Sequence, residues 1–214
     1  MKTHPIRPLS IAVAFAAALS TSHAAFNYTE TFSVDNDAAG WFVFTDASVA
    51  SIAQNPVTDR LDFSATGYGL FFLGADDNTS LGAFTGDYAS FPIHAVSFDL
   101  SLGVGSTVSD LFVQLTNFTE DETWQSTLTP NAPGTTATFT LPTDSSGTGW
   151  TQISGDQSFA FLLDDVEDFS LLFVGSGNLA GSLDNVSAIP EPSTALFGGL
   201  AALGLLRRRR TARA

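Results

Sequence analysis

Short apolar segments separated by Gly, Ser, Thr, Asn and Asp recur through the middle of the chain, and each predicts a β-strand. In the clearest, residues 93–102, the apolar residues Val96, Phe98 and Leu100 alternate with polar ones. This period of two turns one face of a strand inward and the other to water. Residues 169–174 are apolar on both faces, which predicts a central strand. The other predicted strands are residues 26–34, 41–44, 61–65, 68–73, 111–115, 123–128, 136–141, 150–153, 159–163 and 179–186.

The number and length of these segments indicate the fold class. Twelve short predicted strands without a sustained helical period suit two packed antiparallel sheets, so we expect an all-β, jelly-roll-like β-sandwich. Residues 25–187 have the size of one domain. Of the 19 phenylalanines, 17 lie between Phe26 and Phe173. Their rings are expected to fill the sandwich without the help of a cofactor.

The first 24 residues have the pattern of a cleaved signal peptide. Lys2 and Arg7 precede an apolar run over residues 9–19, and Ser22 and Ala24 form the small-residue site that a signal peptidase accepts. The run is too short to span a bilayer core of about 30 Å. We therefore expect the chain to be exported.

The last 27 residues, 188–214, combine a Pro-Glu-Pro motif, a short apolar run and an arginine cluster. Their members are Pro190, Glu191, Pro192, residues 195–206, Arg207, Arg208, Arg209 and Arg210. Four arginines are expected to stay on the cytoplasmic side of a membrane, which leaves the preceding domain outside it. An ordinary C-terminal anchor is the alternative, but it predicts a longer transmembrane helix.

These three features in this order resemble the PEP-CTERM sorting domain of Gram-negative bacteria that make extracellular polysaccharide. The resemblance implies that the apolar helix holds the protein transiently in the inner membrane. It also implies that an exosortase processes the tail and sends the domain to the cell surface or the extracellular matrix.

Charge is distributed unevenly. Residues 25–188 contain 21 acidic residues and one cation, Arg60, for a net charge of −20. A domain with a single cation cannot neutralise a phosphate backbone, so nucleic acid is excluded as a partner. The chain has no cysteine, which excludes disulfides, thiol nucleophiles and cysteine-ligated metals.

The two ends of this domain resemble the first and last strands of carbohydrate-binding jelly-roll modules of the galactose-binding-like type. The matching segments are residues 28–41 and 183–187. The resemblance implies a structural calcium ion, with Glu30, Asp35 and Asp184 as candidate ligands. Acidic residues are also common in turns for backbone reasons, so solvated turn carboxylates remain the alternative.

Tryptophans beside amide side chains are candidates for sugar binding, because a sugar presents apolar ring faces and hydroxyl groups. Trp124 precedes Gln125, and Trp150 lies two residues before Gln152. Core packing of both rings is the alternative reading.

Catalytic patterns are missing from the domain sequence. His94 is its only histidine, it contains no lysine, and no Gly-x-Ser-x-Gly motif occurs. We therefore expect an exported, non-enzymatic surface or matrix protein, with glycan binding and a structural calcium as its candidate properties. A polysaccharide hydrolase with a carboxylate pair and a purely structural, calcium-dependent matrix protein remain alternatives.

Overall fold

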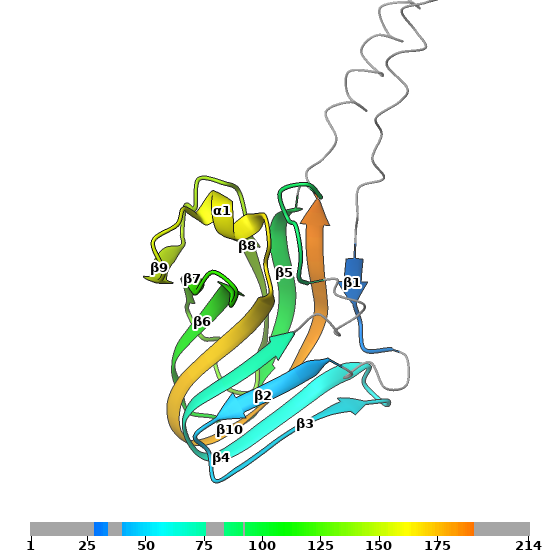
Figure 1. The fold of residues 1–214 in the computed structure, drawn as a ribbon. Coiled ribbons are helices and arrows are strands. Elements are labelled where there is room, and N and C mark those ends of the chain that lie inside the picture. Colours follow the sequence, from blue (N-terminus) through cyan, green and yellow to red (C-terminus); the bar gives the residue numbers. More distant parts are fainter. Residues whose placement is uncertain (1–27, 34–39, 76–83, 92, 191–214) are drawn as a thin grey trace, which may run out of the picture. The chain divides into compact units, whose positions relative to one another are not determined.

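The computed structural model describes residues 28–33, 40–75, 84–91 and 93–190, and in them the chain forms an antiparallel β-sandwich, which confirms the expected fold class (Figure 1). It contains ten strands and one short helix. They are β1 Tyr28–Glu30, β2 Trp41–Thr45, β3 Val49–Asn55, β4 Arg60–Ala75, β5 Ile93–Leu102, β6 Val108–Asn117, β7 Glu122–Leu128, β8 Thr136–Pro142, β9 Thr151–Ser154, α1 Phe159–Leu163 and β10 Asp168–Pro190.

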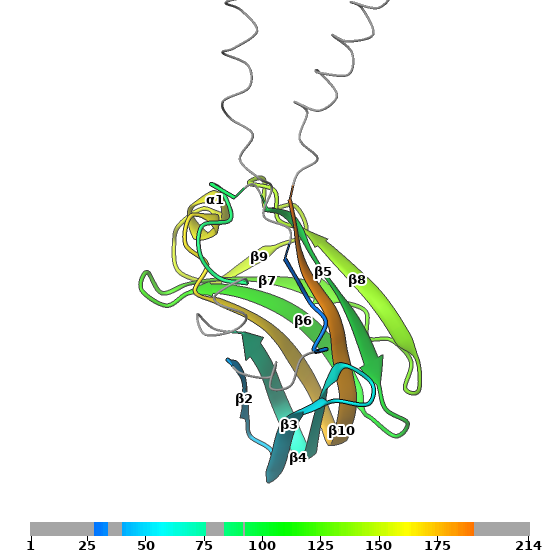
Figure 2. The same ribbon diagram turned by 90° about the vertical axis from the view of Figure 1, so that its right-hand side faces the viewer.

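Two long strands, β4 and β10, run through both layers. The first sheet has the order β2-β4-β10-β6-β7-β9 and uses the C-terminal part of β4 and the N-terminal part of β10. The second sheet is formed by β3, the other parts of β4 and β10, β5 and β8, and β1 also pairs with β10. Figures 1 and 2 show β10 passing from one sheet into the other.

Phenylalanine rings occupy much of the space between the sheets. Phe63, Phe71 and Phe173 form one cluster with ring centroids 5.2 to 6.0 Å apart. Phe169 contacts Phe84 and Phe98 in a second cluster, and all of these rings are almost completely buried. Offset and edge-on ring contacts add to the free energy gained by burying apolar area. The prediction that phenylalanines fill the core is confirmed.

One predicted strand is wrong, because residues 159–163 form helix α1. Ser158 begins the helix, and its hydroxyl accepts a hydrogen bond from the backbone N of Phe161. The buried side chains, Phe159, Leu162 and Leu163, have the spacing of one helical face. A five-residue apolar run carries too little periodicity to separate a strand from a helix.

Other strand predictions differ from the structure mainly in their bounds. Residues 93–102 form β5 as predicted, whereas the four predicted strands at 61–65, 68–73, 169–174 and 179–186 merge into β4 and β10. Strand β3 was not predicted, since its sequence VASIAQN lies at a sheet edge and is mostly exposed, so its pattern is weak. Of the predicted strand at 26–34, residues 28–30 form β1 and residues 31–33 are not in a strand, where Phe32 has φ 51°. Residues 26, 27 and 34 lie outside the described residues.

Candidate functional site

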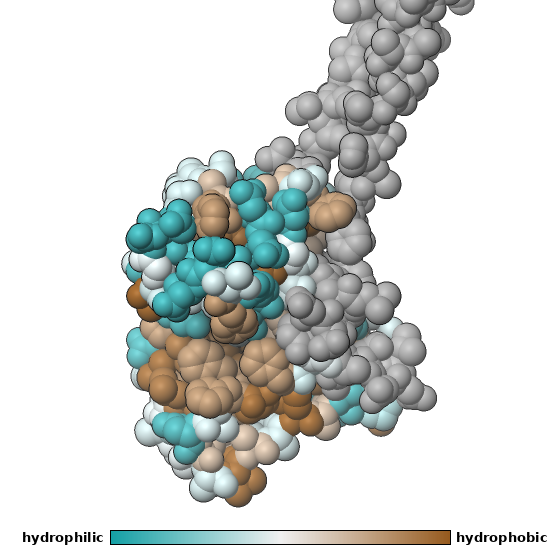
Figure 3. Space-filling view, in the orientation of Figure 1, coloured by the Kyte–Doolittle hydropathy of each residue, from teal (hydrophilic) through white to brown (hydrophobic). Residues whose placement is uncertain are grey.

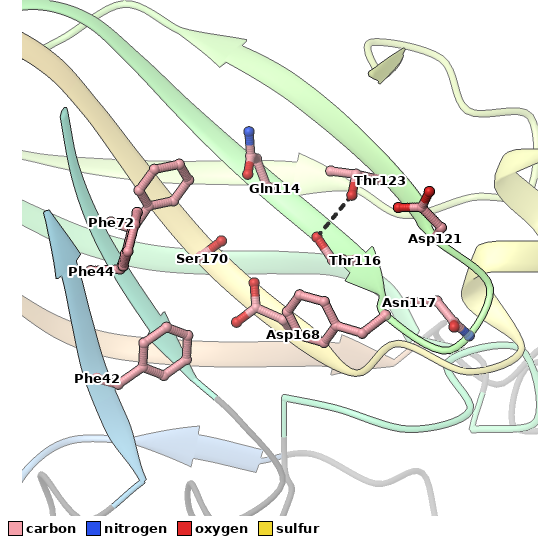
Figure 4. A pocket seen from close by; sticks show the side chains of 11 residues that line it. Phe42, Phe44, Phe72, Gln114, Thr116, Asn117, Asp121, Thr123, Asp168 and Ser170 are labelled. Carbon is pink, nitrogen blue, oxygen red and sulfur yellow. Dashed lines mark hydrogen bonds between the residues drawn. The ribbon is translucent and has the colours of Figure 1, made fainter. Parts of the chain in front are cut away.

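A groove lies on the face of the first sheet that points away from the core, and it encloses about 380 Å³ (Figure 4). Strand alternation places its residues there, because their neighbours Leu171, Leu73 and Leu115 point into the core. The lining comes from five strands, β2, β4, β6, β7 and β10, and one hairpin turn. It consists of Phe42, Phe44, Phe72, Gln114, Thr116, Asn117, Phe118, Asp121, Thr123, Asp168 and Ser170.

Phenyl rings form one side of the groove. Phe44 is 68% exposed and its ring centroid lies 6.0 Å from that of Phe72. Phe42 lies over Gly74, where a Cβ atom would come 2.4 Å from its ring. Because glycine leaves this space open, the Phe42 ring can lie close to the β4 backbone. Figure 3 shows the resulting apolar area on this face, next to a hydrophilic area nearer α1.

Amide and hydroxyl groups form the floor. Ser170 lies opposite Gln114, which lies opposite Gln125, so the three share one row across the sheet. The Gln114 Nε2 donates a 2.9 Å hydrogen bond to Gln125 Oε1. In the next row Thr123 donates to Thr116 over 3.3 Å. The groove thus places polar groups beside the phenyl rings, the combination that a sugar ring requires.

The β6–β7 turn closes one end of the groove with Phe118, 66% exposed, and Asp121. Glu167 fixes this turn, since its Oε2 accepts hydrogen bonds from the backbone N of Phe118 at 2.6 Å and of Thr119 at 3.0 Å. The Thr119 hydroxyl donates to its other oxygen. These hydrogen bonds lower the pKa of Glu167, and the bond from the Thr119 hydroxyl has the largest effect. The turn is therefore held by an ionised carboxylate.

Glu122 anchors the neighbouring corner from inside the protein. Its side chain is fully buried. The Oε1 atom accepts hydrogen bonds from Trp124 Nε1 and Gln152 Nε2, both at 2.6 Å, and Oε2 accepts one from the backbone N of Gln157 at 3.0 Å. One carboxylate thereby ties β7, β9 and the start of the α1 region together, directly beside Asp121 and Thr123 in the groove.

The two tryptophans predicted to bind sugar lie in this corner rather than in the groove. Trp150 is 8% exposed, stacks on Phe159 at 5.1 Å and donates from Nε1 to the Pro142 carbonyl. Trp124 is half-buried and packs on the same Phe159 at 5.2 Å. The structure brings both rings together through Phe159, and this packing leaves little of the Trp150 ring for a ligand.

Sequence reasoning missed the groove phenylalanines. Their signal was available in Trp41-Phe42-Val43-Phe44 and in Phe71-Phe72-Leu73, where apolar residues occupy both faces of a strand. Such runs predict either a strand covered on both faces or a strand with an apolar binding face. Only the arrangement of the sheets distinguishes the two.

The two candidate calcium ligands that the structure describes, Glu30 and Asp184, do not lie on one face. Glu30 lies opposite Val186, on the core side of β10, and its Oε1 accepts a bond from the backbone N of Phe32. Asp184 follows the core residue Leu183 and points to the other side. Asp35 lies outside the described residues. In the described ranges no group of three His, Cys, Asp or Glu side chains is arranged to hold a metal, and calcium stays a prediction.

Asp184 faces Arg60, whose Nε lies 3.7 Å from its carboxylate. The pKa of Asp184 is raised, and burial is the largest cause. A hydrogen bond from the Asn185 backbone N and the charge of Arg60 lower the pKa, whereas the charges of Asp99 and Asp59 raise it. An acid with a raised folded-state pKa contributes stability that is fully present below its unfolded-state pKa and is lost as pH rises through the folded-state value.

We therefore expect Arg60→Met to lower the free energy of unfolding by up to about 1 kcal/mol at neutral pH. The loss should shrink toward zero as pH falls through the raised folded-state pKa of Asp184, because the protonated carboxyl no longer attracts the Arg60 charge. Urea unfolding at a series of pH values measures this, and Arg60→Lys serves as the charge-conserving control. An equal loss at all pH values would contradict the assignment of the effect to the ion pair.

The predicted sorting motif falls almost entirely outside the described residues. Pro190 is the last residue of β10 and pairs with Ile93. Glu191, Pro192 and the arginines Arg207 to Arg210 are not described, and neither are residues 1–24. Within the described ranges, the structure has no helix with the length and apolarity of a membrane span. The predicted domain boundaries remain predictions.

No protein-family model and no curated protein matches this sequence. Among solved structures, a family 11 carbohydrate-binding module of a cellulosomal cellulase from Clostridium thermocellum matches with a TM-score of 0.53 and 14% identity, over 76% of this chain and 95% of that one. A family 11 module in complex with a beta-1,3-1,4-mixed-linked tetrasaccharide, from the same organism, has a TM-score of 0.50 and 14% identity, over 71% and 89%.

An agarase matches with a TM-score of 0.54 and 12% identity, but the match covers 76% of this chain and only 26% of the agarase. At these identities the similarity concerns the fold. The chain thus has the β-sandwich fold of carbohydrate-binding jelly-roll modules, as the resemblance of its two ends predicts.

Proposed function

We propose that this protein is a non-catalytic carbohydrate-binding protein and that the groove on the first sheet binds a glycan chain. The groove itself is the observation that carries this proposal. It sets the exposed rings of Phe44 and Phe118 beside the polar row of Ser170 and Gln114. Sugar rings bury their apolar faces on aromatic rings, while their hydroxyls exchange hydrogen bonds with amides and carboxylates. The family 11 module solved with a tetrasaccharide supports it.

The sequence signals at both ends add a location to this proposal. Export by the N-terminal signal and processing by an exosortase at Pro190, Glu191 and Pro192 would deliver the domain to the cell surface or the extracellular matrix. A glycan-binding domain in such a matrix would attach to its polysaccharide. A structural calcium ion, with Glu30, Asp35 and Asp184 as candidate ligands, remains part of this proposal.

We expect Phe44→Ala and Phe118→Ala each to weaken glycan binding by about 10- to 100-fold, since burying an exposed phenyl ring contributes about 1.5–3 kcal/mol. Neither should change the melting temperature, because both rings are largely exposed. Affinity electrophoresis against a panel of soluble polysaccharides selects the ligand, and calorimetry measures the dissociation constants.

The matched control is Phe91→Ala, since Phe91 is 53% exposed but does not line the groove. Its affinity should equal that of the wild type. Retardation by none of the polysaccharides, or equal losses in all three variants, would contradict binding in the groove. Release of reducing ends from a bound polysaccharide would instead identify a hydrolase.

A further inference from the structure

The charges around the groove all have one sign. Its lining contains two carboxylates, Asp121 and Asp168, and no lysine, arginine or histidine. Glu120 lies in the turn that carries Phe118, and Glu167 holds this turn through hydrogen bonds. Neighbouring carboxylates of one sign in a partly enclosed space create a negative potential that attracts cations and repels anions.

The only arginine or lysine of residues 25–188 cannot offset this potential. Arg60 begins β4, whereas Phe72 lines the groove twelve residues farther along that strand. Twelve strand residues cover about 40 Å measured along β4, whereas the Debye length at physiological salt is about 8 Å. Arg60 is also occupied by Asp184 in the second sheet. A uronate or sulfate group on a glycan would therefore enter the groove without a counter-charge.

The phenyl rings favour the same kind of ligand as the carboxylates. The face of an aromatic ring attracts a cation through its quadrupole, and Phe42, Phe44, Phe72 and Phe118 all line the groove. Figure 4 shows the Asp168 carboxylate on the floor between Phe42 and Thr116. An ammonium group in this position would meet a carboxylate from below and ring faces from the side, two contacts that a hydroxyl or acetamido group makes less well.

We infer that the ligand of this groove is an amino polysaccharide, a glycan whose sugar rings carry free, protonated amino groups. The inference rests on the proposed glycan binding and specifies its chemical class. The amines pair with Asp121 and Asp168, the ring faces of the sugars pack on the phenylalanines, and anionic polysaccharides are rejected.

Three oligosaccharides of equal length and the same β-1,4-linked backbone test this: oligomers of glucose, of N-acetylglucosamine and of glucosamine. At a pH acidic enough to protonate the amines, calorimetry should show the glucosamine oligomer binding about tenfold more tightly than the other two. The preference should weaken as salt screens the charges and vanish at a pH where the amines are neutral. A polyuronate should not bind.

A pair of Asp→Asn variants locates the effect. Asp121→Asn should reduce the ratio of amino to neutral affinity about fivefold. Asparagine suits this site because Asp121 has φ 53°, a conformation that asparagine tolerates. Asp110→Asn is the control and should leave the ratio unchanged. Asp110 lies on the same face of the sheet, opposite Val174, which is six residues or about 20 Å farther along β10 than Asp168.

The outcomes separate this inference from the function on which it rests. Equal affinity for the three oligomers, or binding of the polyuronate, overturns the amino-sugar assignment and leaves glycan binding in place. The amino-sugar assignment is also overturned if none of the three oligomers binds but another polysaccharide of the panel does, with an affinity that Phe44→Ala and Phe118→Ala reduce. Binding of no glycan at all overturns both.

Discussion

Replacing Glu122 with alanine is expected to lower the free energy of unfolding by about 3 kcal/mol and the melting temperature by about 6–12 °C. The fully buried carboxylate accepts hydrogen bonds from Trp124, Gln152 and the backbone N of Gln157. Its removal leaves these donors without their acceptor and opens a cavity, and each unsatisfied buried donor costs about 1–3 kcal/mol. The loss should appear in thermal and urea unfolding.

Two variants make this result specific. Glu122→Gln keeps the volume and one acceptor oxygen, so about 1 kcal/mol of loss is expected. Glu120→Ala alters an exposed carboxylate in the adjacent turn and should stay within about 0.5 kcal/mol of the wild type. The tryptophan fluorescence should shift toward that of a solvated indole only in Glu122→Ala, because Trp124 loses the acceptor of its Nε1 hydrogen bond. A Glu122→Ala protein as stable as Glu120→Ala would show that the carboxylate does not hold the corner.

Gly175→Ala is expected to destabilise the domain by about 3 kcal/mol or more and to reduce the soluble yield. Gly175 lies where β10 changes register as it passes from the first sheet to the second. A Cβ atom there would come 2.1 Å from the Thr107 carbonyl oxygen and 2.2 Å from the Tyr68 hydroxyl. A backbone carbonyl cannot move aside as a side chain can, so the crossing itself must shift.

The Tyr68 hydroxyl adds to this constraint, since it donates a 2.5 Å hydrogen bond to the same Thr107 carbonyl. Burial raises the pKa of Tyr68 to about 12, so the hydroxyl remains a donor at neutral pH. Gly69→Ala is the matched control, because the three atoms nearest its Cβ all belong to the Asp46 carboxylate. This side chain accepts hydrogen bonds from the backbone N of Gly69 and Leu70, but it can shift without moving a backbone carbonyl. Urea unfolding should show less than about 1 kcal/mol of loss for the control. Equal stability of both variants would refute a tight crossing.

Local patterns explain which elements could be predicted. Residues 96–102 alternate apolar and polar side chains along most of a strand, so β5 was predicted with its bounds. The run at 159–163 is too short to show a period. The Ser158 cap and the packing of Phe159 against Trp124 and Trp150 stabilise it as a helix. Strand β3 has little apolar character, and pairing with β4 supplies its stability.

The candidate site depended on contacts that no local pattern contains. Phe44 and Phe118 are separated by more than 70 residues, and Asp168 lies opposite Thr116 only through the pairing of β10 with β6. The sequence predicts aromatic sugar contacts at Trp124 and Trp150, which lie outside the groove lining. Core and surface aromatics look alike in a sequence, because a strand apolar on both faces does not reveal which face another sheet will cover.

The sequence alone determined the all-β class, the packing of phenylalanines in the core and the acidic charge, since these follow from residue periodicity and composition. The tertiary structure decided which phenylalanines remain exposed and which polar groups join them, because strand pairing across long stretches of chain sets the faces of each sheet. Strands β4 and β10 belong to both layers, and their pairing places Phe71 and Phe173 in the core. Phe72, on the opposite face of β4, lies beside Phe44 in the groove.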